Sequence, residues 1–110
     1  MITLHLQFVP KHGKEKELKA AIIDKWMDAM AKQPGFITAI MLTPYKEEEL
    51  KKLNVPVPKH SFEVISVWKS EEERAAWAAR PIHKEVFTQV LDVTETRIGS
   101  LQNVLHSWNL

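Results

Sequence analysis

The period of the apolar residues changes near Gly13, and this change constrains the fold more than any other feature. Residues Ile2 to Val9 alternate between apolar and more polar side chains, which is typical of a strand with one apolar face. From Lys14 the apolar residues recur every three or four positions, so a helix with one buried face is predicted. Its apolar positions are Leu18, Ala21, Ile22, Trp26, Ala29 and Met30. Pro34 and Gly35 are expected to end it.

The middle of the chain contains two further strand patterns. Strands are predicted at Phe36–Thr43 and Ser61–Lys69, where β-branched and aromatic residues gather. Between them lies the charged segment 46–53, in which only Leu50 and Leu53 are apolar. It is predicted to form a solvated surface helix. The alternative is a lid over a pocket, because long connections often carry function.

The last third of the chain carries helix signals and then a final strand pattern. Ser70, with Glu73 three residues later, forms a capping-box pattern, so a helix is predicted to start at Ser70. Pro81 interrupts it and is expected to open a second helix, because proline suits a first helical position. That second helix is predicted to reach Gly99, a plausible C-terminal cap. Leu101–Leu110 is the predicted last strand.

The predicted order of elements is β-α-β-β-α-β. A four-stranded antiparallel sheet with both long helices on one face satisfies the connection rules, so we expect a ferredoxin-like α+β fold. At 110 residues the chain has room for a single modest core. Residues 1–110 are therefore expected to form one domain.

Composition excludes several classes of protein. Lys and Arg number 15 against 14 Asp and Glu, for a net charge of +1 and no basic cluster, so no nucleic-acid partner is expected. Cysteine is absent, which removes disulfides, thiolate nucleophiles and Cys-based metal sites. No apolar run approaches the roughly 20 residues that span a bilayer, and the first residues do not match a signal peptide. A cytoplasmic protein without a membrane partner is the expectation.

The predicted helices cover one face of the sheet, and the other face is also partly apolar. Its residues are Thr3, His5, Gln7 and Val9 on the first strand, Ile65 and Val67 on the third, and Val104, His106, Trp108 and Leu110 on the last. Such a surface is too apolar to leave in water over a large area. We therefore expect a homodimer in which two sheets pack face to face.

Two histidines on that free face are secondary candidates for a site. If Ile2 pairs near Asn109, His5 lies close to His106 on the same face. The two imidazoles beside Trp108 would then bind a metal or share a proton. A polar patch within the dimer interface is the alternative, and it is favoured because two histidines without a third ligand make a poor metal site.

Three short motifs carry a family resemblance. They are Gly35-Phe36 at the start of a strand, Val67-Trp68-Lys69-Ser70 from a strand into a capped helix, and Ala76-Trp77 followed by Pro81-Ile82-His83. With these motifs the chain resembles, over nearly its whole length, the antibiotic biosynthesis monooxygenase family of dimeric α+β barrels. The resemblance implies a homodimeric enzyme that oxidises a small aromatic or polyketide-like molecule without a bound cofactor. A non-catalytic dimer that binds a small hydrophobic ligand is the alternative.

The haem-degrading branch of that family fits less well. Its pattern has an Asn on the first strand, a Trp on the second helix and an axial His ten residues after the Trp. Trp77 matches the tryptophan, but Leu6 and Phe87 stand at the other two positions. Haem iron requires a proximal ligand, so haem is disfavoured as a cofactor. The Asn that some cofactor-independent members carry on the third strand is also missing, and Val64 and Ser66 occupy the positions where it is expected.

The resemblance points to His83 as a general base, with Trp68, Trp77 and Trp26 lining the substrate site. His83 is expected at the start of a helix, where backbone N–H groups disfavour protonation of the imidazole. The alternative is a histidine that only packs on Trp77. The tryptophans are alternatively plain core residues. An open pocket between helices and sheet is what distinguishes these interpretations.

Overall fold

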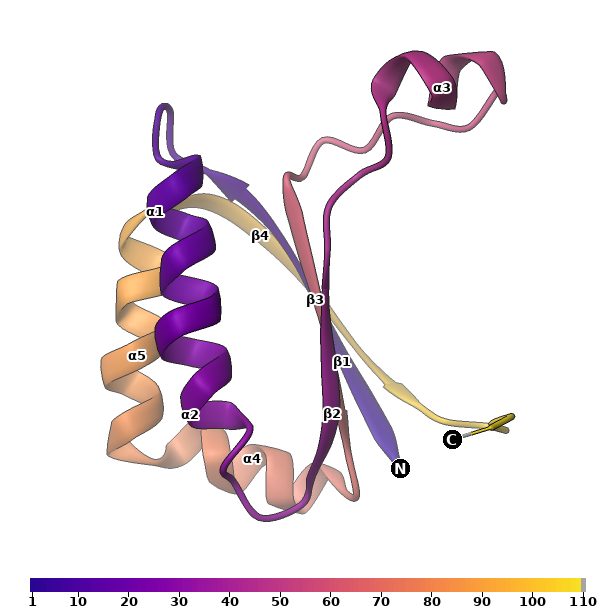
Figure 1. The fold of residues 1–110 in the computed structure, drawn as a ribbon. Coiled ribbons are helices and arrows are strands. Elements are labelled where there is room, and N and C mark those ends of the chain that lie inside the picture. The colour runs from indigo at the N-terminus through magenta and orange to yellow at the C-terminus, as the bar shows by residue number, and fades with distance from the viewer. Residues whose placement is uncertain (110) are drawn as a thin grey trace.

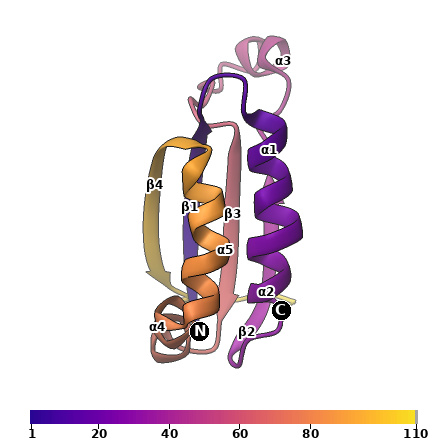
Figure 2. The ribbon, with the colours of Figure 1, turned by 90° about the vertical axis from the view of Figure 1, so that its left-hand side faces the viewer.

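The structure, a computed structural model, describes residues 1–109 and forms one sheet with helices on one side (Figure 1). The elements are β1 (Ile2–Pro10), α1 (Glu15–Ala20), η1 (Ala21–Met27), α2 (Asp28–Met30), β2 (Phe36–Leu42), α3 (Glu47–Lys52), β3 (Phe62–Trp68), α4 (Glu71–Ala79), α5 (Pro81–Asp92) and β4 (Thr94–Asn103). The strand order is β2-β3-β1-β4, with antiparallel neighbours throughout. The predicted ferredoxin-like α+β fold is confirmed. Figure 2 shows the helix from α1 to α2 and helix α5 side by side over this sheet.

The first helix is continuous, but its middle turns form a π-helix, η1, rather than the predicted α-helix. Its buried residues, Leu18, Ile22, Trp26 and Met30, are spaced strictly by four. In an α-helix each step of four passes a full turn by about 40°, so such a row drifts away from the sheet. The wider turns of a π segment reduce this drift. They keep Trp26 and Met30 on the buried face.

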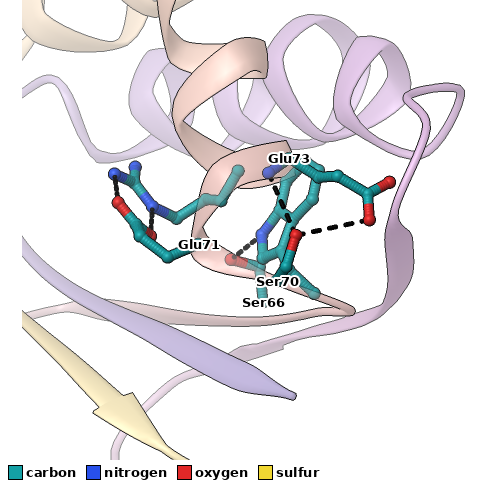
Figure 3. Close-up of polar contacts among 6 residues, drawn as sticks. Ser66, Ser70, Glu71 and Glu73 are labelled. Atoms are coloured by element: carbon teal, nitrogen blue, oxygen red, sulfur yellow. Dashed lines mark hydrogen bonds and ion pairs between the residues drawn. The ribbon is translucent and has the colours of Figure 1, made fainter.

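Ser70 caps α4, as the sequence predicts. Its Oγ accepts a hydrogen bond from the Glu73 backbone N–H at 3.2 Å and donates one to Glu73 Oε1 at 3.3 Å (Figure 3). Gly35 lies against the same glutamate with a φ of +83°, and a Cβ at Gly35 would lie 2.6 Å from Glu73 Cβ. The turn before β2 can therefore approach α4 only because residue 35 is glycine.

The core lies between the helices and the sheet. Its buried residues come from both layers: Ile2, Phe8, Leu18, Ile22, Trp26, Met30, Val64, Trp68, Trp77, Val86 and Val90. Three of them are tryptophans, so a large part of the core is aromatic. Within the described part of the chain, no helix has the length and apolar character needed to cross a membrane.

The C-terminal third differs from the prediction. Helix α5 ends at Asp92 and β4 runs over Thr94–Asn103, so both the predicted helix up to Gly99 and the predicted strand Leu101–Leu110 are wrong in position. Thr94 Oγ1 donates to the Val90 carbonyl at 2.8 Å, which satisfies a carbonyl at the helix end. From there Thr94, Thr96 and Ile98 alternate with other side chains, a β-branched pattern that favours a strand. Leu110 lies outside the described residues.

The shifted strand removes the proposed histidine pair. Ile2 pairs with Asn103 and His5 pairs with Ser100, rather than Ile2 with Asn109. His106 follows the end of β4 and lies against the edge of Trp108, with ring centroids 4.6 Å apart. The expected His5–His106 site is therefore wrong. The same shift takes Val104, His106 and Trp108 out of the strand, and β4 offers Ile98, Ser100 and Gln102 beside Gln7, His5 and Thr3 of β1.

The sheet face opposite the helices has an apolar rim and a centre that mixes polar residues with Ile65 and Val67 of β3. Ile98 of β4 is 69% exposed and Ile40 of β2 is 51% exposed. Between them, His5 Nδ1 lies 3.8 Å from Glu63 Oε2, and His5 Nε2 lies 3.1 Å from Thr3 Oγ1. No helix covers this face in Figure 1.

Candidate functional site

A cavity of about 260 Å³ lies between the helices and the sheet. Its lining comes from three strands and four helical segments: Leu4, Leu6, Trp26, Met30, Ser66, Trp68, Arg74, Trp77, Ala78, His83, Phe87, Arg97 and Gly99. All four residues of the predicted site, His83 and the three tryptophans, are in this group. Part of the space between the helices and the sheet is therefore an open pocket, and the packed core fills the rest.

His83 is the third residue of α5, which begins at Pro81 immediately after α4. Arg80 fixes this corner, because its Nη1 donates to Gln33 Oε1 at 2.8 Å, near the end of the first helix. The His83 imidazole meets Trp77 edge-on, with centroids 4.8 Å apart, and stacks on Phe87 at 5.0 Å. Its ring is thus held between aromatic residues of α4 and α5.

Burial lowers the pKa of His83 below its ordinary value of 6.5, and the charges of Arg74 and Arg97 lower it further. The direction agrees with the expectation from sequence. The cause differs, because burial and two arginines act on the ring rather than the start of the helix. The imidazole is neutral at neutral pH, so one ring nitrogen has a free lone pair that can accept a proton.

Trp68 is fixed at the end of β3 by a buried hydrogen bond. Its Nε1–H donates to Ser66 Oγ at 3.0 Å (Figure 3), and its ring meets Phe36 edge-on at 5.6 Å. Ser66 is itself buried and lines the cavity. The indole therefore has one defined orientation in the wall of the cavity.

Trp26 closes the cavity from the first helix. Its ring packs against Phe8 at 6.0 Å and Phe87 at 4.9 Å. Unlike the N–H of Trp68, its Nε1–H is buried without a hydrogen-bond partner in residues 1–109. The place of Trp26 on a buried stripe of the sequence predicts only an apolar role, because the stripe carries no information about the direction of the N–H.

Two arginines line the cavity, and one of them has its charge paired with a carboxylate. Arg74 forms two hydrogen bonds of 2.6 Å with Glu71, and these lower the pKa of the Glu71 carboxyl. The Arg97 guanidinium lies over the Phe87 ring, 5.1 Å from its centre. Both arginines line the cavity, and no Asp or Glu is among its lining residues. An anionic or acidic ligand is therefore favoured over a cationic one.

Sequence reasoning missed these arginines for different reasons. Arg74 lies three residues before Trp77 on α4, a spacing that places both on one helix face, so this residue could have been found. Arg97 was assigned to the end of a helix. Only the correct strand assignment places it beside the cavity.

A more open hollow of about 500 Å³ shares three of the cavity's residues, namely Ala78, His83 and Phe87. His83 therefore lies at the boundary between the inner cavity and the outer surface of α4 and α5. This position gives the imidazole access both to a bound molecule and to solvent.

The secondary candidates lie elsewhere. His5 borders a hollow of about 220 Å³ on the free sheet face, with Gln7, Glu63 and Ser100. That hollow is on the opposite side of the sheet from His83. His106 lies beyond β4, and α3 contributes nothing to the cavity. Residues 1–109 contain no group of three or more His, Cys, Asp or Glu side chains arranged to hold a metal ion.

Comparison with known proteins finds likeness in structure alone. No family model matches the chain, and no curated protein matches its sequence. SnoaB, a cofactor-independent oxygenase from Streptomyces nogalater, is similar with a TM-score of 0.76 and 18% identity over 99% of this chain and 97% of that chain. A candidate antibiotic biosynthesis monooxygenase from Nitrosomonas europaea has a TM-score of 0.75 and 17% identity, over 96% of this chain and all of that one (100%).

A dimeric ferredoxin-like protein of unknown function from Thermobifida fusca is also similar, with a TM-score of 0.72 and 13% identity over 94% and 90% of the two chains. The fold of the chain is thus one that antibiotic biosynthesis monooxygenase-like proteins share. The fold expected from the sequence resemblance and the fold found by structural likeness are therefore the same.

Proposed function

We propose that this protein is a cofactor-independent monooxygenase that oxidises a small planar aromatic or polyketide-like substrate. The observation that carries the proposal is the gathering of His83 and three tryptophans around one cavity. Aromatic walls suit a flat ring system, and a neutral imidazole suits removal of a weakly acidic proton. The description of SnoaB as a cofactor-independent oxygenase supports the same reading.

The reaction that fits these groups converts an acidic CH₂ between aryl rings into a carbonyl. His83 takes one proton from this carbon, and the resulting anion spreads its charge onto a substrate oxygen. The anion gives one electron to dioxygen, and the carbon radical and superoxide combine into a peroxide. The O–O bond then breaks as the second hydrogen leaves, so CH₂ and O₂ become C=O and H₂O. The protein supplies the base, the orientation and a site that excludes bulk water.

Oxygen uptake by purified protein, treated with a chelator and given a dihydroxyanthrone, tests the proposal. We expect consumption of dioxygen equimolar with quinone formation and well above the uncatalysed rate. His83→Ala should lower the rate by about 10² or more, since general bases contribute about 10² to 10⁴. His12→Ala, in the exposed turn after β1, is the matched control. If the protein binds the anthrone but oxygen uptake is no faster than in the blank, the protein binds ligands and is not an oxygenase.

The cavity does not fit haem. Phe87, at the position of the axial histidine in the haem-degrading branch, presents an apolar ring stacked on His83. Leu6, at the position of the asparagine, is an apolar part of the cavity lining. No step is assigned to haem, and the absence of a Soret band after addition of haem is the expected result.

We also propose that the protein acts as a homodimer joined through its free sheet face. The exposed isoleucines at positions 40 and 98 form the apolar rim of that face, and burying them against a second copy removes apolar surface from water. The dimeric ferredoxin-like protein from Thermobifida fusca, which has the same fold, supports this arrangement.

A further inference from the structure

Arg97 brings to the cavity a positive charge that no carboxylate of residues 1–109 neutralises. Arg74, the other arginine of the lining, is tied to Glu71 by two hydrogen bonds of 2.6 Å. None of the ion pairs within residues 1–109 involves Arg97. A guanidinium without a partner at a cavity favours an anionic group on the molecule that binds there.

The register of β4 places this guanidinium at the solvent-facing edge of the cavity. Arg97 pairs with Phe8, whose side chain is buried in the core, so both side chains rise from the helix-covered face of the sheet. β4 is an edge strand, and Arg97 is exposed. Its guanidinium lies over the ring of Phe87, which also lines the cavity. A ligand entering from solvent can therefore contact the guanidinium directly.

The contact with Phe87 positions the guanidinium and leaves its hydrogen-bond donors free. The carbon at the centre of the guanidinium lies 5.1 Å from the ring centroid, within the range of a cation–π interaction. A phenyl ring offers no oxygen or nitrogen acceptor, so the N–H groups of Arg97 remain for water or a ligand. Two of them match the two oxygens of one carboxylate, because the guanidinium is a planar fork.

The cavity thus has an apolar inner end and a charged outer edge. Trp26 and Trp68 are 2% and 1% exposed, whereas Arg97 is exposed. A flat ring system suits the inner end, and a carboxylate on that ring system suits the outer edge. The charge of Arg97 also lowers the pKa of His83, so the guanidinium is close enough to act on the candidate base.

We propose that Arg97 binds a carboxylate of the substrate, so that the cavity selects an aromatic or polyketide-like acid over its neutral analogue. This proposal deepens the proposed function and rests on it for the ring system and for the reaction at His83. The carboxylate pair itself requires only that a flat aromatic acid enters the cavity. Pairing at one edge then leaves a single orientation in which the rings reach the tryptophans.

Two ligands of the same shape and different charge test the proposal. 2-Naphthoate carries a carboxylate, and 2-naphthamide replaces it with a neutral amide. The wild type should bind 2-naphthoate about tenfold more tightly, and Arg97→Gln should raise the Kd for 2-naphthoate by about tenfold. The Kd of the variant for 2-naphthamide should stay within about twofold of the wild-type value. An equal change for both ligands, or no change for either, overturns the carboxylate site.

Lys46→Gln is the matched control. It removes the same charge at an exposed residue just before α3, and α3 is not part of the cavity. Its Kd for 2-naphthoate should equal that of the wild type. A loss as large as that of Arg97→Gln attributes the effect to net charge and overturns the role of Arg97.

Salt provides a measurement on the wild-type protein alone. Between about 0.02 M and about 0.5 M NaCl, the Kd for 2-naphthoate should rise, because salt screens a charge pair that solvent can reach. The Kd for 2-naphthamide should change little. The same response from both ligands contradicts a charge pair.

Turnover separates this inference from the proposed function. At about pH 8, where His83 is neutral in either protein, Arg97→Gln should raise KM for a dihydroxyanthrone carboxylic acid and leave kcat nearly unchanged. Binding of 2-naphthoate through Arg97 without oxygen uptake keeps this inference and rejects the oxygenase. Oxygen uptake that needs His83 but gives the same KM in Arg97→Gln keeps the oxygenase and rejects the inference. A wild-type protein that binds none of 2-naphthoate, 2-naphthamide and 2-naphthol overturns both.

Discussion

The imidazole of His83 lies nearly parallel to the ring of Phe87, with centroids 5.0 Å apart and planes at 28°. The two residues are four apart on α5, so they share one helix face. Phe87 also packs on Trp26 and lies under the Arg97 guanidinium. One phenyl ring therefore connects the candidate base, the Trp26 indole and a positive charge.

His83 should titrate below 6.5, because burial and the two arginines disfavour its protonated form. Ring-proton NMR over a pH series measures this directly, with His83→Gln to assign the signal. Arg97→Gln should raise the pKa of His83, since it removes one repelling charge, whereas Arg97→Lys should leave it nearly unchanged. A His83 pKa above 6.5 contradicts the geometry described for the cavity.

The same lowered pKa makes stability depend on pH. The unfolded chain protonates residue 83 near 6.5, while the folded chain stays neutral until a lower pH. Below 6.5 the unfolded state therefore binds more protons, and the free energy of unfolding falls as pH falls through this window. Above 6.5 the group contributes nothing. Urea unfolding at about pH 7.5 and about pH 5.5 measures this change. Between these two pH values, the free energy of unfolding should fall by more for the wild type than for His83→Gln. An equal fall in the free energy of unfolding for both proteins would show that His83 does not cause this pH dependence.

Most of the sheet and helix pattern up to Pro81 follows from local sequence. The alternation in β1, the stripe on the first helix and the Ser70 cap each depend on neighbours in the chain, so short-range rules predict them. The π turns of η1 are different, because the spacing of four among the buried residues acquires meaning only once the helix is packed on a sheet. Periodicity alone does not distinguish this row from an ordinary amphipathic helix.

The C-terminal misassignment shows a different limit. Gly99 was taken for a helix cap, but it lies in β4 opposite Leu6, where a side chain would meet that leucine. The small residue therefore answers to a contact with a residue far away in sequence. The identities of the tryptophans and His83 pointed to a common site, whereas the arginines and the unpaired N–H of Trp26 required the three-dimensional arrangement.

Ile98→Lys should weaken the proposed homodimer. Residue 98 is 69% exposed on the free sheet face, and burying a lysine ammonium at a sheet interface without a partner is costly. Sedimentation velocity should show dimer for wild type and a shift to monomer at the same concentration for the variant. Ile23→Lys is the matched control, because Ile23 is an exposed isoleucine (44%) of η1, which lies on the helix-covered side of the sheet (Figure 1). A variant that stays dimeric places the interface elsewhere.

Gly99→Val should block the cavity while leaving the fold in place. A Cβ at residue 99 would lie 2.9 Å from Leu6 Cδ2, and both residues line the cavity, so the leucine methyl must move or the cavity must narrow. Valine otherwise suits a strand, and the contact is with the end of a flexible side chain, so the cost in stability is small. We expect affinity for 2-naphthol to fall by about tenfold or more with little change in Tm. Ser100→Val, the next residue of the same strand, lies opposite His5 on the other sheet face and should leave affinity unchanged. A Gly99→Val protein that binds as well as wild type shows that ligands enter a different part of the molecule.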